Sequence, residues 1–322
     1  MAESCCTPGR ESQNSEPSQS CNSSSPSVFA TSPIIPSDSS LLADLKLQEI
    51  PAGTFLMGTD DEAGFPDDDE GPIRSVTVPQ FRIGRYTVTN AIFARFVEAT
   101  GYITESERFG WSFVFHLLVS RNARKRGDVQ QVPGLEWWRA VSGASWNHPE
   151  GRGSHIRDRQ DHPVVHVSHN DATAFCTWAT ATTNTAITLP TEEQWERAAR
   201  GGLEQKRYVW GDDLTPEGVH MCNIWQGDFP RINTRDDGFI GTCPVDTYQP
   251  NGFGLFNMAG NVWEWCSDIW HARGVAAPDR RVMRGGSYLC HHSYCNRYRV
   301  AARSSNTVDS STGNCGFRVV AS

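Results

Sequence analysis

Two stretches of the sequence decide its fold class, PTEEQWERAARGG at residues 190–202 and IRSVTVPQFRIGRYTVT at residues 73–89. In the first, Thr191 and Gln194 have the spacing of a capping box and Gly201 can end a helix in the left-handed conformation. The second alternates apolar with polar residues, which predicts strands. A chain with both signals and no strand-helix-strand rhythm is typical of an α+β fold.

The regions around these stretches repeat both signals. Thr89 can cap a second helix that has apolar residues at 92, 93, 96 and 97 on one face and ends at Gly101. A third helix is predicted near NDATAFCTWA at residues 170–179, and further strands within residues 47–59. The chain also has 28 Gly, 18 Pro and 11 Trp without any internal repeat. We therefore expect one α+β domain, rich in loops, at residues 46–322.

The N-terminal residues have a different composition. Residues 1–40 contain 13 Ser and 5 Pro and few large apolar side chains, so they cannot offset the entropy cost of ordering. We predict a disordered tail at residues 1–45 and expect deletion of residues 1–40 to leave activity intact. Cys5 and Cys6 lie in this tail. We interpret them as solvated thiols, although adjacent thiols could also capture a soft metal.

Composition excludes several classes of partner. The 322 residues carry 29 Lys and Arg against 37 Asp and Glu, a net charge of −8 with no basic stripe, which argues against nucleic acid. No apolar window is long enough to span a membrane, and the first residues lack the pattern of a signal peptide. We therefore expect a cytoplasmic monomer, in which the 10 cysteines are buried thiols, metal ligands or redox groups.

The spacing of Cys290 and Cys295 sets them apart from the other cysteines. Five positions on a regular helix or strand would point the two sulfurs in different directions, so they can cooperate only if the chain turns between them. A disulfide, two independent buried thiols and a zinc site with His291 or His292 are the alternatives. A pair of thiolates suits Cu(I), a soft cation of low coordination number.

Residues 285–307, GGSYLCHHSYCNRYRVAARSSNT, followed by GFRV at 316–319, closely resemble the active-site segment of formylglycine-generating enzymes, also called sulfatase-modifying factors. The resemblance runs from about Leu47 to the end of the chain. Its specific part is the two-cysteine segment, because the other motifs recur in non-catalytic paralogues and in iron enzymes of thiohistidine biosynthesis. Those motifs include MGTDDEAGFP (57–66), YTVTNAIFARFVEATGY (86–102), DHPVVHVSHNDA (161–172), CNIWQGDFP (222–230) and NGFGLFNMAGNVWEWC (251–266).

The resemblance implies a variant of the C-type-lectin-like fold and a specific oxidation. The substrate is the cysteine of a C-x-P-x-R motif in an unfolded sulfatase chain, which becomes Cα-formylglycine with O2 and a thiol reductant. Cys290 and Cys295 match the two cysteines that bind Cu(I) and then the substrate cysteine. Ser287 and Tyr294 match positions near the oxygen and the substrate thiol, and Trp263 matches an aromatic residue that lines the pocket.

The resemblance also implies calcium sites built from loop oxygens. Calcium takes six to eight oxygen ligands in flexible geometry, which suits such residues. One set would use Asn223 and Asp237 with the carbonyls of Ile224 and Phe239; the other would use Asn257 and Glu264 with the carbonyls of Gly260 and Val262. We interpret the acidic run at residues 67–70 as a solvated loop.

Some positions depart from the family pattern. Secreted animal relatives have structural cysteines where this chain has Ala199, Val300 and Val319. His169 and altered loops near the pocket leave the substrate range open. The alternative functions are a non-catalytic paralogue or lectin-like binding module, and an iron sulfoxide synthase. We expect packed or free thiols at Cys176, Cys222, Cys243, Cys266 and Cys315.

Overall fold

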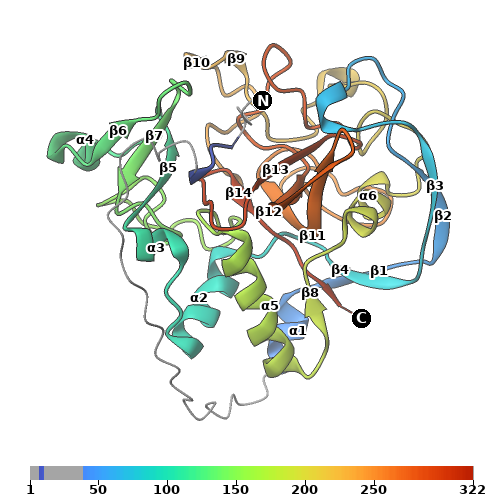
Figure 1. Ribbon diagram of the computed structural model, residues 1–322, viewed down its shortest axis with the longest axis horizontal. Coiled ribbons are helices and arrows are strands. Elements are labelled where there is room, and N and C mark those ends of the chain that lie inside the picture. Colours follow the sequence, from blue (N-terminus) through green and yellow to red (C-terminus); the bar gives the residue numbers. More distant parts are fainter. Residues whose placement is uncertain (1–6, 11–38, 322) are drawn as a thin grey trace.

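Helices and strands are short, and irregular loops connect most of them (Figure 1). The structure is a computed structural model that describes residues 7–10 and 39–321. Its α-helices are α1 (Ser39–Asp44), α2 (Asn90–Thr100), α3 (Glu105–Phe109), α4 (Arg121–Arg126), α5 (His169–Thr183) and α6 (Glu192–Arg200). Single 3-10 turns lie at Pro66–Asp68 and Pro216–Gly218.

The strands form small sheets. They are β1 (Leu47–Ile50), β2 (Gly53–Met57), β3 (Arg74–Val78), β4 (Phe81–Gly84), β5 (Trp111–Phe115), β6 (Val129–Gln131), β7 (Trp138–Ser142), β8 (Ile187–Thr188), β9 (Gly227–Asp228), β10 (Ile232–Asn233), β11 (Trp263–Ala272), β12 (Val275–Arg284), β13 (Arg303–Thr307), β14 (Cys315–Gly316) and β15 (Val320–Ala321). The strand orders are β1-β4-β15-β8, β13-β12-β11-β14, β5-β7-β6, β2-β3 and β10-β9. Within the described residues, this mixture confirms the predicted α+β fold with little regular structure.

The three predicted helices are confirmed with their caps. The Thr191 side chain accepts from Gln194 N–H at the start of α6, and Gly201 ends that helix with φ of 58°. Thr89 caps α2, and Gly101 ends it in the left-handed region. Helix α5 covers the third predicted segment and begins with a capping box that was not predicted. The sequence analysis also missed α3, although Thr104 and Glu107 form the same box there.

The predicted boundary of the N-terminal tail is too late in the chain. Helix α1 precedes residue 46, and Leu41 and Leu45 are buried in the same hydrophobic cluster as α2 and α5. Thr7 and Arg10 are also buried against the domain. The remainder of the predicted tail, including Cys5 and Cys6, lies outside the described residues.

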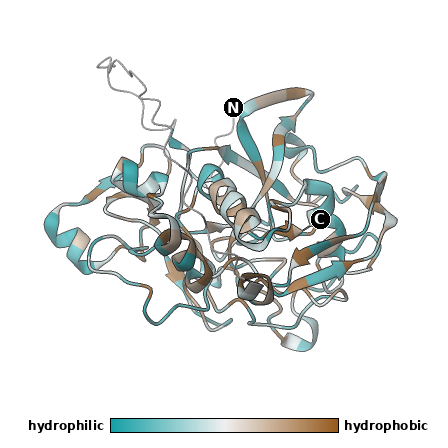
Figure 2. Ribbon diagram, turned by 90° about the horizontal axis from the view of Figure 1, so that it is seen from below, coloured by the Kyte–Doolittle hydropathy of each residue, from teal (hydrophilic) through white to brown (hydrophobic). Residues whose placement is uncertain are grey.

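The core has two large hydrophobic parts that meet around β11 and β12. One contains Phe93, Phe175 and Trp263, and the other packs β2, β3 and β4 against α6. Strands and helices carry hydrophobic and hydrophilic stretches side by side, as expected for elements with one buried face (Figure 2). Among residues 7–10 and 39–321, no helix has the length and apolar character needed to cross a bilayer.

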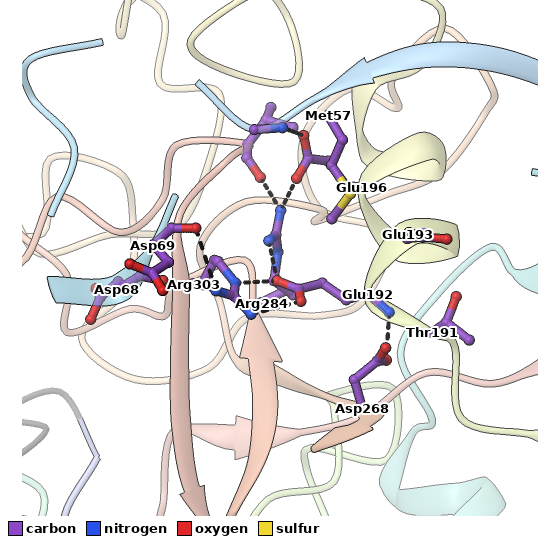
Figure 3. Close-up of polar contacts among 12 residues, drawn as sticks. Met57, Asp68, Asp69, Thr191, Glu192, Glu193, Glu196, Asp268, Arg284 and Arg303 are labelled. Carbon is purple, nitrogen blue, oxygen red and sulfur yellow. Dashed lines mark hydrogen bonds and ion pairs between the residues drawn. The ribbon is translucent and has the colours of Figure 1, made fainter. Parts of the chain in front are cut away.

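A buried ion-pair network joins α6 to the end of β12 (Figure 3). Arg284 is fully buried and binds Glu192 at 2.7 Å and Glu196 at 2.5 Å. Arg303, at the start of β13, binds both oxygens of Glu192 at 2.5 and 2.9 Å. Because the chain leaves β12 at residue 284, the network fixes the point from which the two-cysteine segment begins.

Candidate active site

Residues 285–295 form an irregular loop directly after β12. Gly285 and Gly286 have φ of 93° and 72°, and a Cβ on Gly286 would lie 2.8 Å from the carbonyl oxygen of Arg297. Two turns follow, in which Cys290 N–H donates to the Ser287 carbonyl at 2.9 Å and Cys295 N–H donates to the His291 carbonyl at 2.8 Å. The glycines therefore allow a path that no regular element would follow.

The loop brings the sulfurs of Cys290 and Cys295 to 3.3 Å from each other. This confirms that the chain turns between them, and both side chains are buried. The separation exceeds the roughly 2.05 Å of a disulfide, so the two sulfurs are not joined. His291 instead contacts Ser293 through Nδ1 at 2.8 Å. In the described part of the chain, no three His, Cys, Asp or Glu side chains gather as a metal site, so the zinc alternative gains no support.

An aromatic pocket lies over the two sulfurs. Tyr294 stacks on Phe229 with ring centroids 4.5 Å apart and meets Trp137 edge-on at 4.9 Å. Trp137 reaches the pocket from the β6-β7 connection, Trp138 from the start of β7 and Phe229 from the β9-β10 connection. None of the residues that line it in the described part of the chain is charged; they are Trp137, Trp138, Phe229, Ser287, Leu289, Cys290, Tyr294 and Cys295. The sequence analysis missed the three aromatic residues, because nothing in their spacing connects them to residue 290.

Ser287 is held beside the sulfurs by neutral hydrogen bonds. Its N–H lies 3.4 Å from the Cys290 sulfur, and its hydroxyl accepts from Asn314 Nδ2 at 3.0 Å. Trp263 is fully buried in the same cluster as the cysteines, but it does not line the pocket. Its backbone N–H donates to the Asn314 carbonyl at 2.9 Å. Trp263 thus supports the backbone of Asn314, a residue that the sequence analysis missed.

The acidic run at residues 67–70 is only in part the solvated loop that we expected, because Asp67 and Asp69 are exposed whereas Asp68 and Glu70 are paired with arginines. Asp68 binds Arg297 at 2.6 Å, and Glu70 binds Arg299 with both oxygens at 2.5 and 2.8 Å. The pair formed by Glu70 and Arg299 is buried. Burial raises the pKa of Asp68, although Arg297 opposes the shift. The run therefore clamps the chain just after Cys295, where Arg297 also places a guanidinium nitrogen 3.8 Å from the Cys295 sulfur.

The first predicted calcium set is brought together by two loops. Both carboxylate oxygens of Asp237 accept backbone N–H groups, from Ile224 at 3.1 Å and from Phe239 at 3.2 Å. Burial raises the pKa of Asp237. Asn223 is buried beside them and donates to the Gly241 carbonyl at 2.9 Å. Asp237 and Asn223 thus place hard oxygen donors in one buried region.

In the second predicted calcium set, Arg318 competes with a cation for the carboxylate of Glu264. Glu264 accepts from Arg318 at 2.6 and 2.7 Å and from the Trp195 indole at 2.7 Å. Asn257 Oδ1 is buried and has no hydrogen-bond partner among the described residues. Gly260 lies in a bridge with Asn223, which connects the two sets. Asn257 fits a cation, whereas the carboxylate of Glu264 is already neutralised by Arg318.

The remaining described cysteines lie outside the pocket. All of them are free and buried, which confirms the expectation for Cys176, Cys222, Cys243, Cys266 and Cys315. Burial raises the pKa of the Cys176 thiol to about 12 and that of Cys315 well above its ordinary value. These thiols therefore stay protonated at neutral pH.

The sequence and the structure were compared with known proteins. Residues 46–322 match the family described as sulfatase-modifying factor enzyme 1-like domain. A formylglycine-generating enzyme from Thermomonospora curvata is 55% identical over 286 residues, covering 84% of this chain and 92% of the relative. The structure of PvdO from Pseudomonas aeruginosa is similar with a TM-score of 0.62 at 24% identity, covering 85% of this chain and 93% of that one.

One further relative bears on activity. The mouse protein named inactive C-alpha-formylglycine-generating enzyme 2 is 44% identical over 282 residues. The match covers 87% of this chain and 86% of the relative. Relatives with and without activity therefore share this fold, and the likeness to PvdO concerns the fold alone. The family match over residues 46–322 and the identities above two fifths leave one conclusion: the chain belongs to the sulfatase-modifying factor family.

Proposed function

We propose that this protein is a formylglycine-generating oxidase that converts the cysteine of a C-x-P-x-R motif in a sulfatase chain to Cα-formylglycine. The observation that carries the proposal is the pair of buried sulfurs 3.3 Å apart under an uncharged aromatic pocket. A structural thiol needs no such partner and no pocket. Relatives named formylglycine-generating enzyme at 55% identity support the same activity.

The donor set fits Cu(I) as the cofactor. Cys290 and Cys295 offer two soft sulfur ligands, and among residues 7–10 and 39–321 no carboxylate or imidazole lines their pocket to favour a harder cation. Both thiols must lose their protons to bind a metal, and the Arg297 guanidinium near Cys295 favours negative charge there. When bound, Cu(I) would supply the reactivity toward O2 that side chains lack.

The protein's own residues bind, orient and shield the substrate. The stacked rings of Tyr294 and Phe229 form a wall that excludes water from the sulfurs. Ser287 presents a hydroxyl whose direction is fixed by the donation from Asn314. A substrate thiol that enters this pocket would therefore meet two sulfurs and one oriented hydroxyl. The oxidation consumes O2 and a thiol reductant and releases the substrate sulfur as sulfide.

Calcium is proposed as a structural ion. Asp237 and Asn223 provide buried oxygen donors in loops, and Asn257 Oδ1 has no partner in the described chain. These hard oxygens suit calcium and offer it no redox role. Since Glu264 is engaged by Arg318, we expect the set around Asp237 to bind more tightly.

The test is a reaction in a defined mixture. The copper-loaded protein is incubated with a C-x-P-x-R peptide, O2 and a thiol, and mass spectrometry follows conversion of cysteine to aldehyde. The same peptide with serine in place of cysteine is the matched control. Aldehyde formed only from the cysteine peptide supports the proposal. Copper binding without any aldehyde would instead favour the alternative, a non-catalytic paralogue or lectin-like binding module.

A further inference from the structure

We propose that Cys6 of this chain is itself a substrate of the enzyme and is oxidised to formylglycine in the same molecule. The inference rests on the proposed function. Residues 6–10 read CTPGR, which is a C-x-P-x-R motif and the only match to that pattern in the 322 residues. The structure describes its last four residues, and they are seated on the enzyme.

Arg10 has the most extensive contacts of the segment. Its N–H donates to Ser310 Oγ at 2.9 Å, and its guanidinium donates to Ser311 Oγ at 3.3 Å and to the Trp111 carbonyl at 3.2 Å. The guanidinium also lies 3.9 Å from the ring centroid of Phe109. Arg10 therefore sits in a built site with hydrogen-bond acceptors and an aromatic face, where arginine is favoured over lysine.

The charge of Arg10 is retained in this site. Burial lowers the pKa of Arg10 to about 10, and the nearby Asp309 opposes that shift. The guanidinium is therefore a cation at neutral pH, although only 7% of the residue is exposed. A buried site that binds a cation through directed hydrogen bonds is selective for arginine. Recognition of a motif that ends in arginine requires such selectivity.

The other described residues of the motif are also held. Thr7 and Pro8 are buried, and Asn306 Nδ2 donates to their carbonyl oxygens at 3.4 and 3.0 Å. The segment lies between β5 and β13 (Figure 1). The hydrogen bonds from Asn306 hold the backbone of the segment in place. The two side chains that the motif specifies after the cysteine, Pro8 and Arg10, are both buried against the domain.

The seat of Arg10 is continuous with the active site. Ser310 and Ser311 begin a loop in which Asn314 binds Ser287 at 3.0 Å, and Ser287 contacts Cys290. Ser310 and Asn314 are four positions apart in the sequence, as are Cys6 and Arg10. An extended chain of four residues covers about 13–14 Å. When fully extended, the motif therefore spans at least the distance from Ser310 to Asn314, the residue that binds Ser287.

The reaction at Cys6 balances with the reactants of the proposed function. Oxidation breaks the S–H bond and one Cβ–H bond of Cys6 and makes the carbon-sulfur bond double. O2 accepts two electrons from this oxidation and two from a pair of external thiols, which become a disulfide, and leaves as two water molecules. A water molecule then adds to Cβ and sulfur departs as hydrogen sulfide, leaving the aldehyde.

The test uses the full-length, copper-loaded protein with O2 and a thiol, with no peptide added. After proteolysis, mass spectrometry and an aldehyde-reactive hydroxylamine report the state of residues 5 and 6. We expect conversion at Cys6 and none at Cys5, with a rate that does not depend on protein concentration. Cys5→Ser, the matched control, should keep the conversion, and Cys6→Ser should abolish it.

Arg10→Ala tests the seat separately. We expect conversion of Cys6 to slow by about tenfold or more, because hydrogen bonds to a charged group are lost, while kcat for an added C-x-P-x-R peptide stays unchanged. Arg10→Lys should be slowed nearly as much, since lysine cannot form the directed set of contacts. Equal rates for the wild type and Arg10→Ala would overturn the inference that residues 7–10 position the substrate.

Two outcomes separate this inference from the proposed function. If the protein oxidises an added peptide but leaves Cys6 unchanged, the self-modification is wrong and the proposed function stands. If neither is oxidised, the proposed function fails. Mixing Cys6→Ser protein with Cys295→Ser protein tests reaction between chains, since only the second has a substrate cysteine at residue 6. Conversion in that mixture at the rate of the wild type would overturn the assignment to a single molecule.

Discussion

The two sides of the active-site loop are supported by different kinds of interaction. At its ends, Arg284 and Arg299 are held by carboxylates in buried ion pairs. Beside the sulfurs, Ser287 is held by Asn314 through neutral groups. A carboxylate in the pocket would compete with the thiols for a cation and would repel a thiolate. The difference teaches that charge fixes the frame of this loop and reaches Cys295 through Arg297, while neutral groups orient Ser287 beside Cys290.

The largest effect on activity is expected from replacing the two thiols, which should leave the ion-paired frame of the loop intact. Cys290→Ser and Cys295→Ser should each lower peptide oxidation by at least about a thousandfold, as expected when one member of a catalytic unit is lost. The frame should persist, since a loss of about 1 kcal/mol moves the melting temperature of a domain of this size by only a few degrees. Peptide turnover and calorimetry measure the two effects.

Cys315→Ser is the matched control for these variants. Cys315 is buried, its sulfur lies 3.5 Å from the Met283 sulfur, and it does not line the pocket. The variant should keep turnover per folded molecule. Near-normal turnover of Cys295→Ser, or a loss in Cys315→Ser equal to that in the pocket, would contradict a mechanism with two thiolates.

The next largest effect concerns the charged frame. Arg299→Met should lower the free energy of unfolding by about 3–5 kcal/mol, because it leaves Glu70 buried without its partner. Arg74→Met removes an exposed partner of Glu193 at 3.4 Å and should change it by about 0–1 kcal/mol. Urea unfolding measures both variants. If both lose the same amount, the pair of Glu70 and Arg299 does not act as a buried clamp.

The sequence predicts structural features that depend on neighbouring residues better than contacts between residues far apart in the chain. The caps of α2 and α6 lie within a few residues of each other, so local patterns identified them. The pair of Glu70 and Arg299 joins positions 229 apart, and no local pattern predicts that contact. The resemblance to a known family brought Ser287 and Cys295 into one site. It did not predict that Trp137 and Phe229 would line the pocket while Trp263 would lie behind it.

Calcium removal tests whether a bound ion stabilises the fold in addition to the ion pairs and the neutral hydrogen bonds. A ligand bound only by the folded state adds about 2.7 kcal/mol at a hundredfold excess over its dissociation constant. Chelation should therefore lower the melting temperature, and Asp237→Asn should remove the calcium dependence. Asp236→Asn is the matched control, because Asp236 is exposed and bonds Thr234. An unchanged melting curve after calcium loss, verified by metal analysis, would count against structural calcium.

The last prediction concerns a buried histidine next to the loop that carries Asn314, because the His166 backbone N–H donates to the Thr312 carbonyl at 2.9 Å. His166 is fully buried, contacts Ser112 Oγ at 2.8 Å through Nδ1 and the Pro149 carbonyl at 2.7 Å through Nε2. Burial lowers the pKa of His166 from 6.5 to about 3. Between these values the unfolded chain binds the proton and the folded chain does not. Stability is therefore lost as the pH falls below 6.5, by up to about 1.4 kcal/mol per pH unit.

Other groups titrate in the same range, so the prediction concerns a difference between variants. The wild type should exceed His166→Gln in unfolding free energy near neutral pH, and this advantage should shrink as the pH falls toward 3. His155→Gln, at an exposed position, controls for the loss of any histidine. Parallel pH profiles for the wild type and His166→Gln would mean that the buried imidazole accepts a proton without cost. The buried region that carries Asn314 would then tolerate a charge, and the contrast with the ion-paired ends of the active-site loop would lose its physical basis.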